Sequence, residues 1–404
     1  MSTRQRLCLL SGEYPPRPGG VGDYTHQLAL ALRGRGHEVA VLTIQDGHLV
    51  SCAPPPGAPS EAEFAHPVPG ARPGLDWSPR CWPAVIAAID GLRPTWLHIQ
   101  YQTGAYAMRP GVNLLPWRLR SLPARPRIAV TFHDLLRPYL FPKAGPVRGW
   151  VNRRLAVDAD TVVATNDADA AELRRTLPAA RPPVVIPIGS NIVVSPPHPY
   201  SRAAWRERAG ASPGELLVAY FGLLSPSKGA DLLVEALALL KRPWRLLIIG
   251  GAATAPQDQA YAAALRARID ALGLASRTST TGHVAAAEVS AWLLAADCVA
   301  LPFTDGASFR RGSLLAALAH GCPVITTEPP DSVTRGMLTD TAVLVPPGDR
   351  AALLAALERL ATDGALRATL AAAGPTLTAR FSWEMIAAQH EALYNTPAPI
   401  RGHP

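Results

Sequence analysis

Residues 216–229, LLVAYFGLLSPSKG, end in a turn that brings a lysine to the start of a helical pattern. The apolar run before Gly222 predicts a strand, and the helical pattern Ala230–Leu240 begins just after Ser227 and Lys228. The unpaired N–H groups at a helix start and the helix dipole both favour negative charge. We therefore expect this corner to bind an anion, above all a diphosphate. An ordinary strand–helix turn with a surface lysine is the alternative.

A second candidate anion site lies before another helical pattern, which runs to His320. It consists of Ser308, Arg310, Arg311, Gly312 and Ser313. Arginine forms strong, paired hydrogen bonds with phosphate oxygens. Two cations at a helix N-terminus oppose the helix dipole and cost stability. Because such a pair is locally unfavourable, it indicates an anionic ligand rather than a solvated helix start.

The first glycine-rich loop follows an N-terminal strand pattern and contains Gly19 and Gly20. Glycines there let the backbone approach a ligand closely, and the next helix offers free amides. The loop is not the G-x-G-x-x-G fingerprint of dinucleotide-binding proteins, since no glycine lies near Gln27. An anion-binding loop and a glycine-rich turn without a ligand both fit this pattern.

His133 and Asp134 follow a strand pattern that ends at Phe132. A histidine at the carboxyl end of a parallel strand can hydrogen-bond a substrate hydroxyl or share a proton with a carboxylate. The alternative for His133 is a cap of its own loop. His98 lies inside a strand pattern, which is typical of a packed core residue. The sequence shows no metal-ligand spacing, no Walker A lysine motif and no G-x-S-x-G motif.

The composition is that of a globular protein with anionic partners. The 404 residues are 48% apolar and 17% charged, which suffices for two or three folded domains. A formal charge of +8 favours nucleotides, phosphorylated lipids, nucleic acid or a membrane surface as partners. The arginines are scattered and form no dense block, so we expect no nucleic-acid partner.

Cysteine usage and hydropathy indicate the compartment. The five cysteines include no C-x-x-C pair, which indicates buried thiols in a reducing environment. The N-terminus lacks the apolar segment of a signal peptide, and no run of about 18 uncharged apolar residues predicts a spanning helix. We expect a cytoplasmic protein, with peripheral contact at a membrane surface left open.

Strand and helix patterns alternate along the whole chain, which predicts an α/β fold with parallel sheets. Strands are predicted at 6–10, 38–43, 96–100, 127–132, 161–164, 184–187, 216–221, 244–249, 278–281, 298–301, 323–326 and 342–345. The first helix is expected at Asp23–Arg35. Val50–Pro79, rich in proline, alanine and glycine, predicts a long excursion without regular structure, and Asn191–Gly214 predicts a domain linker.

These elements group into two doubly wound, Rossmann-like domains of similar size. We expect an N-terminal domain at 1–195, a C-terminal domain at 196–380, and a last helix, Trp383–Tyr394, within 381–404. Ligands of such sheets bind outside the carboxyl ends of the strands, and a cleft between two such domains is the default site.

Six segments, in their order and spacing, resemble the family-4 (group 1) glycosyltransferases, which have the two-domain GT-B fold. The segments are SGEYPPRPGGVGDYTHQLALALRGRGHEVAVLT, VTFHD, VIPIGSNI, YFGLLSPSKGADLLVEALALL, LLAALAHGCPVITT and LVPPGDRAALLAAL. The resemblance covers nearly the whole chain. It implies transfer of a sugar from a nucleotide-diphosphate sugar to an acceptor, with retention at the anomeric carbon, no cofactor and no obligatory metal.

The resemblance also implies roles for particular residues. The charge of a diphosphate leaving group would be shared by Lys228, the amides near Gly19 and Gly20, and the helix start at Gly312 and Ser313. His133, with Asp134 beside it, would act near the reacting bond of the donor sugar. The last helix would cross back to the N-terminal domain.

The chain departs from the family pattern at three positions. Leu223 stands where the family has an arginine. Ser308 and Ala316 stand where it has two glutamates, which usually handle the donor sugar and the nucleotide ribose. We hypothesise that Arg310 and Arg311 supply the positive charge of the missing arginine.

Other functions fit the same fold. The missing glutamates favour a catalytically degenerate protein that binds a nucleotide or a partner. A nucleotide-sugar epimerase would convert the donor without an acceptor. A nicotinamide oxidoreductase fits least, because the dinucleotide glycine pattern is incomplete.

The acceptor is not specified by the sequence. The loops at Val50–Pro79 and within 104–120 are expected to select it. The second loop carries a basic and aromatic set, Arg109, Trp117, Arg118 and Arg120. Such a set suits a membrane surface or an anionic acceptor, and a plain solvent-facing loop is the alternative.

Overall fold

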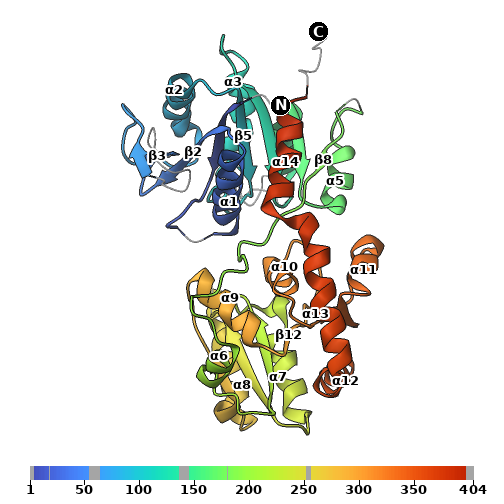
Figure 1. Cartoon of the computed structure of the whole chain (residues 1–404). Helices are drawn as coiled ribbons and strands as arrows, with labels where there is room; N and C mark the ends of the chain where they lie inside the picture. The colour runs from blue at the N-terminus through green and yellow to red at the C-terminus, as the bar shows by residue number, and fades with distance from the viewer. Residues whose placement is uncertain are drawn as a thin grey trace. The chain divides into compact units, whose positions relative to one another are not determined.

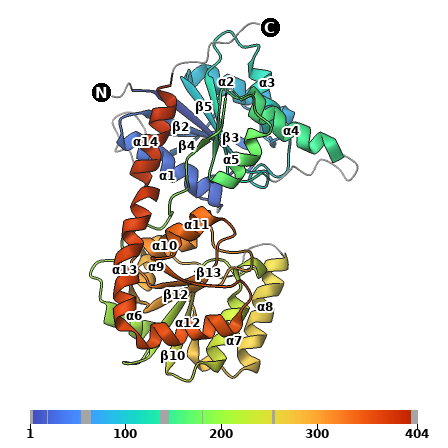
Figure 2. The same ribbon diagram turned by 90° about the vertical axis from the view of Figure 1, so that its right-hand side faces the viewer.

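The computed structural model describes residues 4–17, 19–53, 64–135, 145–179, 181–251 and 256–396. The chain forms two compact units, Met1–Gly189 with Trp383–Pro404, and Ser190–Ser382 (Figure 1). The chain therefore leaves unit 1 near residue 189, somewhat before the boundary expected at 195, and returns to it at Trp383. Each unit is a sheet with helices on both faces (Figure 2), which confirms the predicted α/β class with two doubly wound domains.

Unit 1 contains an eight-stranded sheet in the order β4-β3-β2-β1-β5-β6-β7-β8. The strands are β1 (Arg6–Ser11), β2 (Glu38–Gln45), β3 (His48–Ala53), β4 (Phe64–Pro67), β5 (Trp96–Tyr101), β6 (Arg127–Phe132), β7 (Thr161–Ala164) and β8 (Val184–Val185). The helices of this unit are α1 (Gly20–Gly34), α2 (Trp82–Leu92), α3 (Leu115–Leu119), α4 (Gly145–Asp158), α5 (Asp167–Arg174) and α14 (Trp383–Tyr394).

The expectation that Val50–Pro79 lacks regular structure was wrong. β3 and β4 lie in or beside this stretch and pair antiparallel at the edge of an otherwise parallel sheet. The connection from β2 to β3 is Asp46-Gly47, and both residues have positive φ, 48° and 77°. Two such residues form the tight turn typical of β-hairpins. This Asp-Gly pair was the signal that the proline- and alanine-rich composition obscured.

Helix α14 packs on unit 1 although it is distant in sequence. It lies beside α1 (Figures 1 and 2). The indole of Trp96 donates to the carbonyl of Tyr394 at 3.1 Å, and the Tyr394 hydroxyl bonds His98 Nδ1 at 2.6 Å. His98 is fully buried, as expected for a core residue. The predicted last helix is thus part of the N-terminal unit.

Unit 2 contains a six-stranded, wholly parallel sheet in the order β11-β10-β9-β12-β13-β14. The strands are β9 (Leu216–Phe221), β10 (Trp244–Ile249), β11 (Thr278–Thr280), β12 (Cys298–Leu301), β13 (Val324–Thr327) and β14 (Ala342–Val345). The helices are α6 (Arg202–Arg208), α7 (Ala230–Leu239), α8 (Pro256–Ala271), α9 (Ala286–Ala295), α10 (Gly312–Ala319), α11 (Ser332–Leu338), α12 (Arg350–Thr362) and α13 (Gly364–Thr378). The short 3-10 helix η3 covers Pro226–Lys228.

The interpretation of Asn191–Gly214 as a linker was also wrong, because this stretch contains α6. Trp205 of α6 packs edge-on against Trp292 of α9, with ring centroids 4.5 Å apart. Arg206 of the same helix bonds the Asp297 carboxylate at 2.7 Å. The prolines on both sides of α6 suggested a flexible connection, but the helix is held by these contacts in unit 2.

The five cysteines are free and buried, as expected. Burial raises the pKa of the Cys8 and Cys322 thiols to about 12, which makes them poor nucleophiles. Among the helices that the structure describes, none combines the length and apolarity needed to cross a bilayer.

Buried histidines make unit 1 sensitive to acid. Burial lowers the pKa of His390 on α14 to about 4, whereas an unfolded chain titrates near 6.5. The folded state binds this proton more weakly, so the stability contribution is present above pH 6.5 and is lost as the pH falls toward 4. We expect the unfolding free energy, measured by urea denaturation, to fall by about 3 kcal/mol from pH 7 to pH 4 through this group.

The control is His390→Leu, which removes the titrating ring. Nε2 of His390 has no hydrogen-bond partner among the described residues, so the leucine leaves no orphaned partner for that atom. We expect the variant to have a smaller loss of stability between pH 7 and pH 4. The same loss in both proteins would contradict the account.

Candidate active site

The strand order of unit 2 reverses between β9 and β12, where ligands of such sheets bind. The segments that follow these two strands are tied together at the carboxyl edge. The carbonyl of Ser227 accepts from the Thr304 amide at 3.1 Å. Gly229 has φ +65°, and a Cβ there would lie 2.1 Å from the carbonyl oxygen of Pro302. Only glycine therefore allows the two segments to approach this closely.

Gly222, Lys228 and Ser313 converge at this edge. Gly222 has φ +134°, and a Cβ on it would lie 3.0 Å from the Lys228 Nζ atom and 3.8 Å from the Ser313 Cβ atom. The turn after β9, the end of η3 and the start of α10 thus meet around one ammonium group. The structure brings together residues that the sequence placed in two separate candidate sites.

The Lys228 ammonium is half-buried and has no ion-pair or hydrogen-bond partner among the described residues. Burial and, to a smaller extent, the positive charge of Arg311 lower its pKa to about 8, against a weaker opposing effect of the Asp258 carboxylate. A cation that is partly desolvated and lacks a carboxylate partner costs stability. Such a group is typical of a site that is completed by an anion.

The start of α10 adds hydrogen-bond donors to the same place. Its N-cap residue, Arg311, provides no side-chain cap, and the first residue, Gly312, is exposed. The first amides of a helix have no intrahelical acceptor, so those of Gly312 and Ser313 are suited to an anion. Lys228 and these amides together form the candidate phosphate site of unit 2.

Arg311 is less available than the sequence suggested. Its guanidinium forms an ion pair with both carboxylate oxygens of Asp305 and lies 4.5 Å over the Phe303 ring. Arg310 is exposed, and its amide donates to the Ser308 hydroxyl at 3.3 Å. The hypothesis that this pair replaces the missing family arginine therefore stays a prediction, with Arg311 already partly neutralised.

The structure defines the surroundings of two of the positions that depart from the family pattern, Leu223 and Ala316. Leu223 is 49% exposed. Ala316 is fully buried, and its carbonyl accepts from His320 Nδ1 at 2.7 Å. The other ring nitrogen of His320 bonds the Ser290 hydroxyl at 2.9 Å. Both ring nitrogens of His320 beside Ala316 are thus hydrogen-bonded within the protein.

In unit 1, a carboxylate occupies the helix start that was expected to bind an anion. The Glu13 Oε1 atom accepts from the amides of Val21 and Gly22, at 3.0 and 3.3 Å. A Cβ on Gly19 would lie 2.1 Å from the Glu13 carboxyl carbon. Helix α1 begins at Gly20 instead of Asp23 because this carboxylate caps its first turn. The expectation of free amides near Gly19 and Gly20 is corrected accordingly.

His133 lies half-buried just after β6, at the carboxyl edge of its sheet. Its Nε2 atom is 3.1 Å from the Gln100 Oε1 atom. Because an amide oxygen only accepts, this contact requires the proton on Nε2. The ring of Tyr24 packs edge-on against His133 with centroids 4.6 Å apart, and Trp383 packs on Tyr24 at 5.1 Å. These contacts fix the orientation of the imidazole.

Asp134 is buried, with 6% of its surface exposed. Together with the burial of the phenol, its charge contributes to raising the Tyr101 pKa. Ser227 is exposed, and its hydroxyl lies 3.3 Å from that of Ser225. The Ser227 hydroxyl does not join the group around Lys228 in the contacts that the structure describes.

The basic set in the second loop of unit 1 is largely paired. Arg109 lies 3.5 Å from Asp76, Arg120 forms an ion pair with the buried Asp158, and Arg118 donates to the Ser121 hydroxyl at 2.9 Å. Trp117 is 51% exposed.

Sequence reasoning missed three residues of the unit 1 site. Glu13 follows β1 within the glycine-rich loop, and a carboxylate before an uncapped helix start was the available signal. Gln100 lies opposite Thr131 in the β5–β6 register. Thr131 precedes His133 by two residues in the chain. Tyr24 gave no separate signal, because an aromatic residue on an amphipathic helix is typical of a core position.

The two parallel-sheet α/β units resemble the fold of the GT-B glycosyltransferases. Solved structures with the same fold include sucrose-phosphate synthase from Thermosynechococcus elongatus (TM-score 0.73, 24% identity, 97% of this chain and 98% of that chain). The Anabaena protein HepE in complex with UDP-glucose is also similar (TM-score 0.68, 20% identity, 97% and 100%).

Sequence comparisons give the family. The model for "Glycosyl transferases group 1" matches residues 215–363, and that for "Glycosyl transferase 4-like domain" matches residues 19–189. D-inositol 3-phosphate glycosyltransferase of Jonesia denitrificans is 32% identical over 93% of this chain and 91% of its own length. Phosphatidyl-myo-inositol mannosyltransferase of Mycobacterium leprae is 29% identical over 94% of each chain. The chain belongs to the group 1 glycosyltransferases and is a transferase.

The half-buried position of Lys228 predicts that this residue lowers the unfolding free energy of the free protein while it favours the binding of an anion. Replacing it with methionine removes the cost of a half-buried ammonium and keeps most of the side-chain volume. We expect Lys228→Met to raise the unfolding free energy at pH 7 by about 1 kcal/mol, an amount reduced by solvent access. Urea denaturation measures the change. Lys241→Met, at an exposed position, is the control and should leave stability within about 0.5 kcal/mol. Equal effects of the two substitutions would contradict the strained environment assigned to Lys228.

Proposed function

We propose that this glycosyltransferase moves a sugar from a nucleotide-diphosphate sugar to its acceptor, with retention at the anomeric carbon and without a metal ion. The observation that carries the proposal is the half-buried Lys228 ammonium, which has no anionic partner among the described residues and lies beside Gly222 and Ser313. A diphosphate supplies the missing charge.

The chemistry required at this site is stabilisation of a leaving group. When the bond between the anomeric carbon and the diphosphate oxygen breaks, the electron pair stays on that oxygen. Lys228 and the amides of Gly312 and Ser313 would then carry the added negative charge. Hydrogen bonds from fixed donors act most strongly where water is excluded. The unit 2 site therefore has the donors for this step within its own residues.

His133 is proposed to contact the donor sugar near the reacting bond. Its position at the carboxyl edge and its fixed imidazole, held by Gln100 and Tyr24, support this role. Asp134, being buried, is proposed to act on the charge and position of its neighbours rather than on the substrate directly.

A second candidate function is binding of a nucleotide without transfer. It is favoured by one observation, the absence of a carboxylate at Ser308 and Ala316. Full burial of Ala316 leaves that position without a ligand-binding side chain. The two functions differ in one measurable respect, since only the transferase forms a glycosylated product.

For the acceptor, the similar proteins suggest where to begin. Several are named D-inositol 3-phosphate glycosyltransferases. We propose an anionic acceptor and choose inositol 3-phosphate as the first compound to assay, with unphosphorylated inositol as its matched control. The exposed Trp117 leaves an acceptor at a membrane surface as the second class to examine.

The first test is a transfer assay with UDP, GDP and ADP sugars against this acceptor pair. We expect product from one donor class, with the anomeric configuration of the donor, as read by NMR, and an unchanged rate in EDTA. Lys228→Ala should lower kcat/KM by about 100-fold, the size typical of losing one charged stabiliser of the leaving group. Nucleotide binding without any product would favour the second function. Inverted product, or full activity of Lys228→Ala, would contradict the proposal.

The pKa of Lys228 gives a second test, the pH dependence of UDP affinity. The protonated ammonium binds the diphosphate, so affinity should be nearly constant from about pH 7 to 8, where the terminal phosphate of UDP is ionised, and should fall as the pH rises through 8. Above that point we expect a decrease of up to about tenfold per pH unit, measured by calorimetry. In Lys228→Arg the guanidinium stays protonated, and the decrease should disappear. A decrease of the same size in both proteins would assign it to another group.

A further inference from the structure

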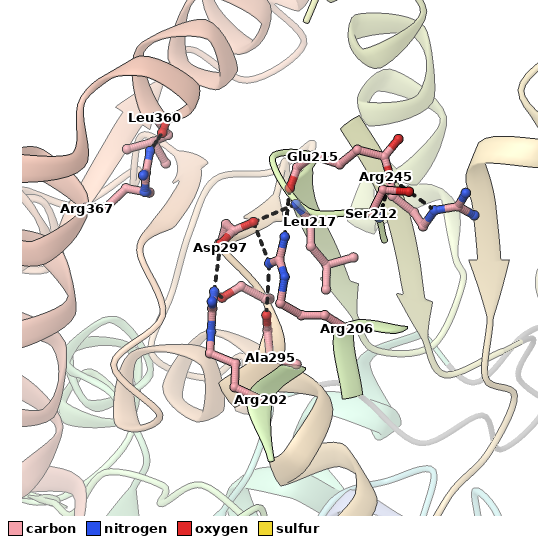
Figure 3. A network of polar contacts seen from close by, with 11 residues as sticks. Arg202, Arg206, Ser212, Glu215, Leu217, Arg245, Ala295, Asp297, Leu360 and Arg367 are labelled. Carbon is pink, nitrogen blue, oxygen red and sulfur yellow. Dashed lines mark hydrogen bonds and ion pairs between the residues drawn. The ribbon is translucent and has the colours of Figure 1, made fainter. Parts of the chain in front are cut away.

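The amino ends of β9 and β12 border a cavity of about 380 Å³ in unit 2. Its charged lining consists of four arginines, Arg202, Arg206, Arg242 and Arg367, and of two carboxylates, Glu215 and Asp297. We call it the arginine cavity, and Figure 3 shows most of these side chains. Neither the proposed function nor any of the sequence motifs makes use of it.

The two carboxylates are already engaged by the protein. Asp297 accepts from the Leu217 amide at 2.8 Å and from Arg202 and Arg206 at 2.7 Å each. Burial opposes its ionisation, but these hydrogen bonds hold the Asp297 pKa below its usual value. The Glu215 carboxylate accepts from the Ser212 amide at 2.7 Å (Figure 3).

Arg206 is likewise used by the fold. Besides its contact with Asp297, it donates to the carbonyl of Glu215 at 2.7 Å and to that of Ala295 at 3.4 Å (Figure 3). Arg206 and Asp297 therefore tie α6 to the ends of two strands. The charges of Arg206 and Asp297, one cation and one anion of the cavity lining, are thus paired with each other.

Arg242 and Arg367 have no such partners. Among the described residues, no carboxylate lies within ion-pairing distance of either guanidinium. One nitrogen of Arg367 donates to the carbonyl of Leu360 at the end of α12, and Figure 3 shows it turned to Leu360 rather than to Asp297. A guanidinium carries five N–H donors, so Arg367 keeps several for another acceptor. Arg242 is exposed at the cavity rim.

The lining therefore carries more positive than negative charge. A concave surface with an excess of one sign attracts ions of the other sign. Guanidinium groups match the geometry of phosphate oxygens and bind them through paired hydrogen bonds. A cavity of this volume falls in the range of small-ligand sites.

We propose that the arginine cavity is a second anion site, which binds a phosphate group, either free or as the ester of a small metabolite. It is distinct from the site around Lys228, because the two lie at opposite ends of β9. Leu216 lines the cavity, whereas Gly222 follows the other end of the strand. A strand of this length separates them by about 20 Å. The proposal does not depend on the proposed transferase function.

The test uses calorimetry with inorganic phosphate and glycerol 3-phosphate on the full chain carrying Lys228→Met, so that the site around Lys228 lacks its ammonium and is weakened. We expect saturable binding of both probes and none of glycerol. Arg242→Glu in the same background should weaken binding by about tenfold or more, since it replaces a cation with an anion. Arg242 makes no hydrogen bond or ion pair among the described residues, so the variant should stay folded.

Arg350→Glu is the matched control. Arg350 is an exposed arginine of α12 outside the cavity, and its substitution gives the same change in net charge. Phosphate affinity should be nearly unchanged in this variant. Tighter binding of glycerol 3-phosphate than of phosphate would identify an ester as the ligand, and equal affinities would identify phosphate itself. Absence of saturable binding in Lys228→Met, or equal losses in the Arg242 and Arg350 variants, would overturn the proposal.

Discussion

The candidate phosphate site of unit 2 depends on one ammonium group, that of Lys228, which is half-buried and has no carboxylate partner among the described residues. Such a placement is unfavourable in the free protein, because partial desolvation of a cation has no compensating charge. Two glycines make it possible: Gly222, whose lack of a Cβ leaves space for the lysine tip, and Gly229, which allows the segments after β9 and β12 to touch. The backbone is therefore arranged around a charge that only an anion satisfies.

In unit 1, by contrast, a helix start is neutralised by a side chain of the protein itself. The start of α1 is occupied by the carboxylate of Glu13, so its helix dipole is already neutralised within the protein. What this unit offers at its carboxyl edge is an imidazole of fixed orientation, His133, held by Gln100 and by the ring of Tyr24. Because α14 contributes Trp383 to the same aromatic group, the last helix of the chain supports the histidine as well as the sheet.

Much of the fold could be predicted because buried parallel strands are continuous apolar runs. The strands of the second half, such as Leu216–Phe221, are the clearest cases. The predictions from sequence were wrong where a high proline content suggested a segment without regular structure. Proline around α6 suggested a linker, and a proline-rich segment obscured the Asp46-Gly47 hairpin.

For the site, the sequence indicated Lys228 and the start of α10 separately. Their meeting depends on strand order, which sequence periodicity does not encode. The capping by Glu13 and the ion pair of Arg311 with Asp305 depend on side-chain reach across loops, which spacing alone does not reveal.

The central claim is most directly tested by measuring the pKa of Lys228 itself. The chain contains only three lysines, Lys143, Lys228 and Lys241, so ¹⁵N NMR of their side-chain nitrogens can be assigned by single substitutions. We expect a Lys228 pKa of about 8 in the free protein and a clear rise when UDP is bound. A Lys228 pKa that lies near 10.5 and does not respond to UDP would contradict the central claim.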